Sequence, residues 1–209
     1  MTTSLLILDS RVAASYVPTS VPTGMRLVIL DPAVDGLEQV AAAVAGEQTL
    51  AAIHIVSHGA PGILQLGGTE VSLATLAGAA GPLARIGASL ASDGDLLLYG
   101  CNVGESEAGA AFLATLAGLT GADVAASTDL SGPTAAGGNW ALERGTGTIE
   151  ARTLADDGFG TLALVTGTTD DDVLGGPMAT IPFAAAAATI GSMRTRAATR
   201  SMVAKATIP

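Results

Sequence analysis

The chain has 209 residues, of which 49% are hydrophobic and 13% are charged, so it can form a sizeable core and is too apolar for wholesale disorder. Its net charge of −10 argues against a nucleic-acid partner, because phosphate backbones attract basic surfaces. No apolar run reaches the roughly 18 residues of a membrane-spanning helix, so we predict no membrane span. One cysteine (Cys101) and two histidines (His54 and His58) exclude a disulfide framework and a zinc site built from several such residues.

The distribution of charge divides the chain into segments. Residues 1–176 carry all nineteen acidic and five of the basic side chains, whereas residues 177–209 carry four basic and no acidic side chains. We predict an α/β domain over residues 1–164, an acidic linker over 165–176, and a low-complexity basic tail over 177–209 without fixed structure. The first residues lack the basic region of a signal peptide, so we expect no cleavable leader in this chain.

Short apolar runs alternate with alanine-rich helical windows along the predicted domain. In chain order we predict strands at 5–9 and 27–31, a helix at 35–45, a strand at 52–57, a small hairpin at 63–71, a helix at 72–89 interrupted near Gly81-Pro82, a strand at 95–99, a helix at 105–119, and strands at 123–126 and 140–143. This alternation predicts a mostly parallel α/β sheet with helices on both faces, plus the small hairpin.

Two strand ends carry chemically reactive side chains. His58-Gly59 closes the strand at 52–57, and Gly100-Cys101 closes the strand at 95–99. Because ligands bind at the carboxyl ends of strands in such sheets, we expect His58 and Cys101 to lie within about 4–7 Å of each other if the two strands are neighbours. The imidazole could then accept the thiol proton, and the Gly59 N–H could face a developing oxyanion, as acyl transfer requires.

Each of these residues also has a plain structural interpretation. A lone cysteine among small residues is usually a buried structural thiol, and a lone histidine at a strand end is often a hydrogen-bonded connection. His54 is interpreted as a packed histidine, and Asn102 and Glu105 as turn and helix-start residues. The functional interpretation rests on the combination, since both candidate residues end successive strands next to a glycine.

That combination resembles the caspase-like cysteine peptidases, in which one strand ends in His-Gly and a second ends in a small residue and Cys. Cys101 follows His58 by 43 residues, and Tyr99-Gly100-Cys101-Asn102 replaces the Gln-Ala-Cys box of caspases proper. The resemblance implies a caspase-like three-layer sandwich and a cysteine endopeptidase with a His58–Cys101 dyad, acting on a polypeptide substrate or its own chain. It also implies that Asp129 could accept a basic substrate side chain, the alternative being a turn aspartate.

A second resemblance covers nearly all of residues 1–164. Ile53-His54-Ile55-Val56-Ser57-His58-Gly59 and Leu96-Leu97-Leu98-Tyr99-Gly100-Cys101 are similar to an uncharacterised bacterial domain family found at the N-termini of large secreted proteins, ahead of cadherin-like and RTX repeats. This resemblance implies an extracellular or cell-surface location for full-length relatives, with the cytoplasm as the alternative for this chain.

The segment at 166–176 is similar to the start of an RTX nonapeptide array. We predict no metal or other cofactor for the domain, and calcium binding at 170–176 only where a complete array of stacked turns is present.

Three function classes remain open on the sequence. The first is a cysteine peptidase that uses His58 and Cys101, and the second is a non-catalytic adhesion, interaction or secretion module that keeps the fold. A nucleotide-binding α/β domain is the weakest of the three, because Leu30-Asp31-Pro32-Ala33 offers neither a glycine-rich loop nor a Walker lysine.

Overall fold

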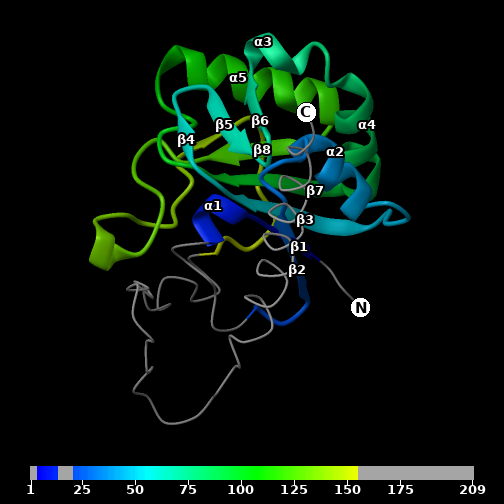
Figure 1. Cartoon of the computed structure of the whole chain (residues 1–209), viewed down its shortest axis with the longest axis horizontal. Helices are drawn as coiled ribbons and strands as arrows, with labels where there is room; N and C mark the ends of the chain where they lie inside the picture. The colour runs from blue at the N-terminus through cyan, green and yellow to red at the C-terminus, as the bar shows by residue number, and fades with distance from the viewer. Residues whose placement is uncertain (1–3, 14–20, 155–209) are drawn as a thin grey trace, which may run out of the picture. The chain divides into compact units, whose positions relative to one another are not determined.

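A six-stranded sheet forms the centre of the domain in a computed structural model that describes residues 4–13 and 21–154 (Figure 1). Its strand order is β2-β1-β3-β7-β8-β9. All neighbours run parallel except β9, which is antiparallel to β8. The strands are β1 (Ser4–Asp9), β2 (Met25–Leu30), β3 (Leu50–Val56), β7 (Leu90–Tyr99), β8 (Asp123–Ala126) and β9 (Arg144–Gly145). The prediction of a mostly parallel α/β sheet is confirmed.

A second, smaller sheet contains three antiparallel strands in the order β4-β5-β6. Two of them, β5 (Ile63–Leu66) and β6 (Thr69–Ser72), form the predicted hairpin, and β4 (Gly59–Ala60) pairs with the outer side of β5. Gly67 turns the hairpin with a φ of 55°, a backbone region that glycine adopts at little cost. This small sheet begins directly after the end of β3, next to His58.

The described residues form five helices, and capping residues are present at some of their ends. They are α1 (Ser10–Ala13), α2 (Gly36–Ala43), α3 (Leu73–Leu76), α4 (Ala80–Ser89) and α5 (Ser106–Thr120), with a 3-10 turn at Thr134–Ala136. The Asp35 carboxylate accepts a 2.9 Å hydrogen bond from the Glu38 N–H at the start of α2. Gly121, with a φ of 74°, ends α5 in the left-handed conformation.

The two faces of the large sheet are covered differently. Side chains of β1 alternate, so that Leu5 and Ile7 join one buried cluster and Leu6 and Leu8 join another. Residues of α2, α4 and α5 pack on the first cluster, on the side where these helices lie in Figure 1. Within the described residues, α1 is the helix on the second face. The rest of the described cover on that face comes from the segment 140–154, including Trp140 and Leu154.

Two predictions of local structure are wrong in detail. Residues 140–143 do not form a strand. The Ala141 N–H donates to the Asn139 side chain at 2.7 Å, and the Trp140 ring packs edge-on against Tyr99 with centroids 6.0 Å apart. The predicted helix at 72–89 is split earlier than expected, between α3 and α4, and Pro82 lies in the first turn of α4. Proline is tolerated there because N–H groups of a first helical turn lack intrahelical acceptors.

The predicted linker at 165–176 and tail at 177–209 lie outside the described residues, as do residues 155–164 of the predicted domain. Within the part of the chain that the structure describes, no helix is long and apolar enough to cross a membrane.

Candidate functional site

His58 and Cys101 follow two adjacent strands at the same level of the sheet. Strands β3 and β7 pair in parallel, and the last pair in their register is Val56 with Tyr99. The Ser57 N–H continues the ladder by donating to the Tyr99 carbonyl oxygen at 3.3 Å. His58 and Cys101 each lie two residues beyond the last pair. The prediction that these residues end adjacent parallel strands is therefore confirmed, and their catalytic roles stay predictions.

Gly59 packs directly against the backbone that carries the cysteine. A Cβ at this position would lie 2.4 Å from the Val103 side chain and 3.1 Å from the Cys101 carbonyl oxygen, so a larger residue would push the two segments apart. Gly100 is tightly packed as well, because a Cβ there would lie 2.8 Å from the Val103 side chain and 3.0 Å from the Leu64 side chain, and it would be in ordinary contact with the Cα of Gly59. The two glycines let the strand ends approach closely, and they bring the His58-Gly59 backbone to Cys101.

Cys101 lies in a tight turn that the neighbouring loop supports. The Val103 N–H donates to the Gly100 carbonyl at 3.3 Å, and Asn102 has a φ of 62°. The Asn102 N–H donates to the Asp129 carbonyl at 2.8 Å. Its side chain donates to Glu105 at 2.8 Å, so the interpretation of Asn102 and Glu105 as turn and helix-start residues is confirmed. The half-buried thiol of Cys101 donates to the Ser131 carbonyl oxygen at 3.8 Å, a weak interaction that a reacting thiol can leave.

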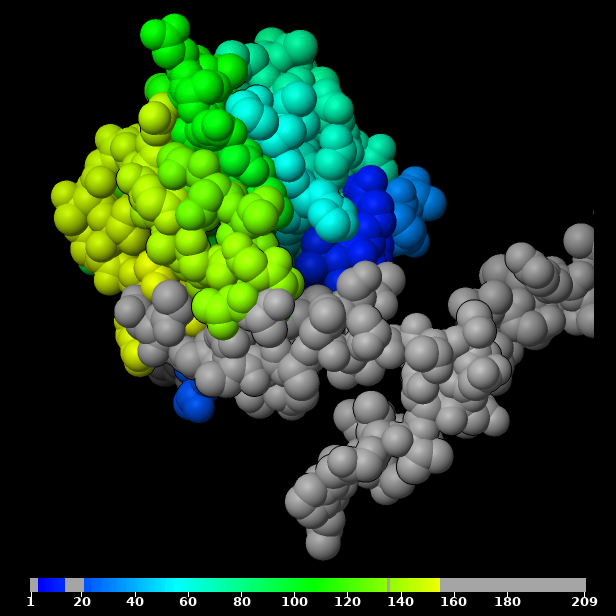
Figure 2. Space-filling view, turned by 90° about the vertical axis from the view of Figure 1, so that its left-hand side faces the viewer, coloured from blue at the N-terminus to red at the C-terminus, as the bar shows by residue number. Residues whose placement is uncertain are grey.

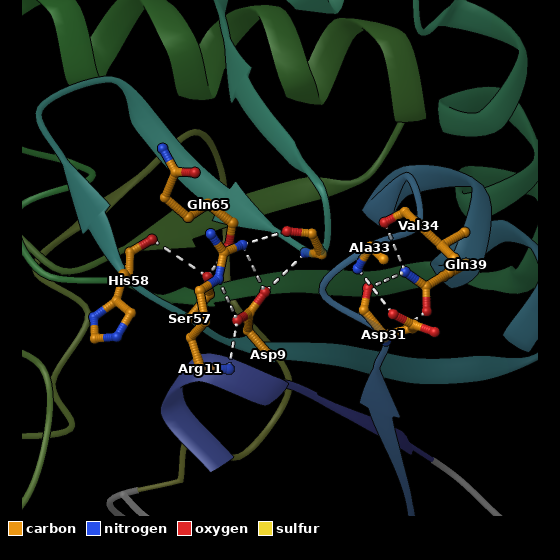
Figure 3. A network of polar contacts seen from close by, with 10 residues as sticks. Asp9, Arg11, Asp31, Ala33, Val34, Gln39, Ser57, His58 and Gln65 are labelled. Carbon is orange, nitrogen blue, oxygen red and sulfur yellow. Dashed lines mark hydrogen bonds and ion pairs between the residues drawn. The ribbon is translucent and has the colours of Figure 1, made fainter. Parts of the chain in front are cut away.

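His58 is exposed, and its main chain is held from two sides. Its carbonyl oxygen accepts hydrogen bonds from the Gln65 N–H at 2.9 Å and from the Ser57 hydroxyl at 3.3 Å. The imidazole points away from the hydrogen-bonded group around Asp9 and Arg11 (Figure 3). Figure 2 shows the face of the molecule that lies at the left in Figure 1. On this face, α1 and the small sheet meet the segments that follow β7 and β8. The backbone of His58 is thus fixed while its ring remains accessible.

Asp129 lies on the loop after β8, beside the cysteine turn, and its carboxylate already has partners. The Asn139 side-chain amide donates to both carboxylate oxygens, at 3.1 and 2.9 Å. The Ser127 hydroxyl donates to one of them at 3.1 Å. The geometry favours a turn-stabilising role, although Asp129 is exposed and lies at the edge where a substrate would approach. Its role in substrate binding stays a prediction.

An ion pair between the buried Asp9 and the partly exposed Arg11 lies next to this site and was not predicted from the sequence. Asp9, at the end of β1, is 0% exposed. It accepts from the Arg11 guanidinium at 3.0 and 3.3 Å and from the Gly67 N–H at 2.7 Å (Figure 3). Arg11 also donates to the Gly67 carbonyl oxygen. Burial raises the pKa of Asp9, but the hydrogen bonds from Arg11 and Gly67 outweigh that effect and hold it below its usual value.

This ion pair fastens the small sheet to the large one. The bridge joins β1 to the turn between β5 and β6, and the Ser57 hydroxyl adds a hydrogen bond to the Gln65 carbonyl oxygen. The sequence feature that could have indicated this ion pair is an aspartate at a strand end followed by an arginine two residues later. Neither residue indicates that Gly67, far along the chain, completes the arrangement.

The interpretation of His54 as a packed histidine is confirmed. It is 1% exposed, and its ring stacks on Tyr99 with centroids 6.0 Å apart and planes at 11°. Burial lowers the pKa of His54 to about 4, so the ring is neutral near pH 7. The Tyr99 hydroxyl lies 3.4 Å from its Nδ1. His54 therefore belongs to the core and leaves His58 as the histidine available for chemistry.

A family model described as a domain of unknown function (DUF4347) matches residues 5–159. No curated protein matches the sequence. The matched region contains both candidate dyad residues and every described element, apart from Ser4 at the start of β1.

Proposed function

The chain belongs to the DUF4347 family, a domain family of unknown function, and we propose that its domain is a caspase-like cysteine peptidase with Cys101 as nucleophile and His58 as general base. The observation that carries this proposal is the register of β3 and β7, which brings His58 and Cys101 to the same level, with Gly59 packed on the cysteine turn. The resemblance of the two strand ends to caspase-like peptidases supports the same assignment.

The proposed reaction is acyl transfer to the cysteine. His58 takes the thiol proton as the Cys101 sulfur attacks the scissile carbonyl, and the Gly59 N–H donates to the oxyanion that forms. His58 then gives that proton to the leaving amine, which breaks the peptide bond and leaves a thioester on Cys101. Water, deprotonated by His58, hydrolyses the thioester and restores the thiol. Asp129 would favour a basic residue before the cleaved bond.

The substrate class and location follow from the second resemblance. Domains of this type in front of cadherin-like and RTX repeats suggest processing of the domain's own longer chain, at the cell surface or outside the cell. In that setting calcium would act through a complete repeat array and not through the proposed dyad. The alternative function is a non-catalytic adhesion, interaction or secretion module that retains the fold.

A thiol-directed peptide warhead tests the dyad directly. We expect a warhead with a basic residue at the cleavage position to label Cys101 of the intact chain, and labelling to slow about 100-fold in His58→Ala, as loss of a general base predicts. His54→Gln serves as the control, because it removes the other histidine from the core and should keep the labelling rate wherever the variant is folded. Mass spectrometry of wild type and Cys101→Ala would show any self-cleavage.

Two outcomes would contradict the proposal. Equal labelling rates in wild type and His58→Ala would mean that the histidine does not assist the thiol. Failure of Cys101 to react with any warhead while the protein is folded would favour the non-catalytic module.

A further inference from the structure

Three carboxylates converge at the edge of the large sheet opposite to His58 and Cys101. Asp95 lies where β7 begins to pair with β8, Asp123 is the first residue of β8, and Glu150 follows β9. Each can offer an oxygen atom such that the three lie within 4.8 Å of one another. These residues are far apart in the sequence, and parallel pairing with the return of the chain after β9 brings them together.

Asp95 gives a second, independent observation that points to a bound cation. This residue is 0% exposed, and its Oδ2 accepts from the N–H groups of Glu150 and Ala151 at 3.0 and 2.8 Å. Its other oxygen, Oδ1, is buried without a hydrogen-bond partner. Buried carboxylate oxygens are almost always paired, because an unpartnered one loses its hydration and gains nothing in return. A buried carboxylate that has an unpartnered oxygen and is clustered with two further carboxylates is therefore a group that a cation would neutralise.

Within the described residues, the ion pairs join arginines to Asp9, Glu38 and Glu47, and none of these pairs includes a carboxylate of the cluster. Burial raises the pKa of Asp95 and the neighbouring charge of Asp123 adds to the rise, although backbone hydrogen bonds oppose it. The cluster thus holds like charges close together in a partly buried position.

The backbone around the cluster is shaped to keep it together. A Cβ on Gly147 would lie 2.1 Å from the Asp123 carboxylate, so a larger residue there would displace this carboxylate from its position. Thr146 bonds to β8 in both directions, because its N–H donates to the Val124 carbonyl and its hydroxyl accepts from the Val124 N–H, each at 3.0 Å. These contacts hold the chain from which Glu150 reaches Asp95.

We propose that Asp95, Asp123 and Glu150 bind a divalent cation, and that this cation is Ca²⁺. A donor set made only of carboxylate oxygens selects hard cations over zinc or copper. The three carboxylates lie close enough to share one ion, since each offers an oxygen within 4.8 Å of the others. Three protein carboxylates suit Ca²⁺, whose coordination is flexible, better than Mg²⁺, which keeps several of its waters and is usually held by one or two carboxylates.

Such an ion would fasten the segment that covers the second face of the sheet. Glu150 and Ala151 already bond to Asp95, and the Leu154 N–H donates to the Tyr99 hydroxyl at 2.9 Å beneath the sheet. A cation shared by β7, β8 and Glu150 would hold this segment against the strands. The site is separate from the proposed dyad, so cation binding can be tested independently of peptidase activity.

Thermal unfolding of the full chain with Ca²⁺, with Mg²⁺ and with EDTA tests the site. At a Ca²⁺ concentration about 100 times the Kd, the unfolding midpoint should rise by about 5–10 °C over EDTA, and Mg²⁺ at the same concentration should give a smaller rise. Isothermal titration should show about one Ca²⁺ per chain, with an affinity at least ~10-fold lower in Glu150→Gln and in Asp123→Asn, since even outer-shell changes cost that much.

Two controls separate this site from general screening of acidic charge. Glu107→Gln removes one exposed charge from the first turn of α5 and should keep the full Ca²⁺ shift. A variant with Asp170, Asp171 and Asp172 all changed to Asn should also keep it, which excludes the acidic segment outside the described residues. Equal Ca²⁺ shifts in Glu150→Gln and Glu107→Gln, or no shift in folded wild type, would overturn the proposal.

Discussion

Asp9 and Asp95 are both completely buried aspartates of the large sheet, and they meet opposite conditions. Asp9, at the carboxyl edge, is paired with Arg11 and with the Gly67 N–H, and its pKa lies below the usual value. Asp95, at the amino edge, has one oxygen bonded to backbone and one without a partner, and its pKa lies above the usual value. Burial alone therefore does not decide whether a carboxylate stabilises a fold.

The difference shows where each edge of the sheet obtains its compensating charge. At the carboxyl edge, the chain itself supplies an arginine two residues after the aspartate, and the pair fastens the small sheet beside His58. At the amino edge, the described residues supply two more carboxylates instead. The first arrangement is complete without a ligand, whereas the second is the kind of arrangement that a cation completes.

Replacement of Asp9 should give the largest effect on stability. We expect Asp9→Asn to lower the free energy of unfolding by about 3 kcal/mol, because it removes the charge of a buried carboxylate that accepts hydrogen bonds from Arg11 and from the Gly67 N–H. Urea unfolding monitored by circular dichroism measures this change. Asp31→Asn is the matched control at the exposed end of β2, where the carboxylate accepts from the Ala33 N–H at 2.8 Å, and it should cost about 1 kcal/mol or less. Similar losses in both variants would mean that the contacts of the Asp9 carboxylate with Arg11 and Gly67 stabilise the fold no more than those of an exposed aspartate.

His54 should dominate the dependence of the free energy of unfolding on pH between pH 7 and pH 4. Since burial lowers the pKa of His54 to about 4, the unfolded chain binds its proton first, and stability is lost as the pH falls from about 6.5 toward 4. The expected loss between pH 7 and pH 4 is about 3 kcal/mol. The low pKa of Asp9 places its contribution below this window.

The His54→Gln variant checks the assignment of that pH dependence. A glutamine does not titrate, so the loss in the free energy of unfolding between pH 7 and pH 4.5 should disappear in this variant. Any change that remains should be a rise on acidification, because the raised pKa of Asp95 makes the folded chain bind that proton before the unfolded chain does. If the slope of wild type persists in this variant, the titrating group is elsewhere and His54 is not the neutral core histidine that its stacking on Tyr99 indicates.

Replacement of Asp95 should give the smallest effect when divalent cations are absent. In EDTA we expect Asp95→Asn to stay within about 1 kcal/mol of wild type, because it removes a like charge beside Asp123 and keeps an acceptor for the two backbone N–H groups. Urea unfolding of this variant and of Asp9→Asn in the same buffer gives the comparison directly. A loss as large as that of Asp9→Asn would mean that the ionised Asp95 is already compensated within the chain.

Local patterns were sufficient for most of the elements and for part of the candidate site. The apolar runs located β1, β2, β3, β7 and β8, and Asp35 and Gly121 act as helix caps in the described structure. The glycines after His58 and before Cys101 marked both strand ends. The strand predicted at 140–143 failed because side-chain contacts of Trp140 and Asn139 hold that segment off the sheet edge. Strand propensity does not include such contacts.

The sequence by itself determined the alternation of strands and helices, the buried character of β3 and β7, and the positions of His58 and Cys101 at strand ends. These features depend on the spacing of apolar side chains and on residues that are neighbours along the chain. Only the tertiary structure decided that β3 and β7 share a register, that Gly67 completes the bridge between Asp9 and Arg11, and that Asp95, Asp123 and Glu150 converge. Those contacts join residues far apart in the sequence, and the order of strands in the sheet, which local spacing does not encode, brings them together.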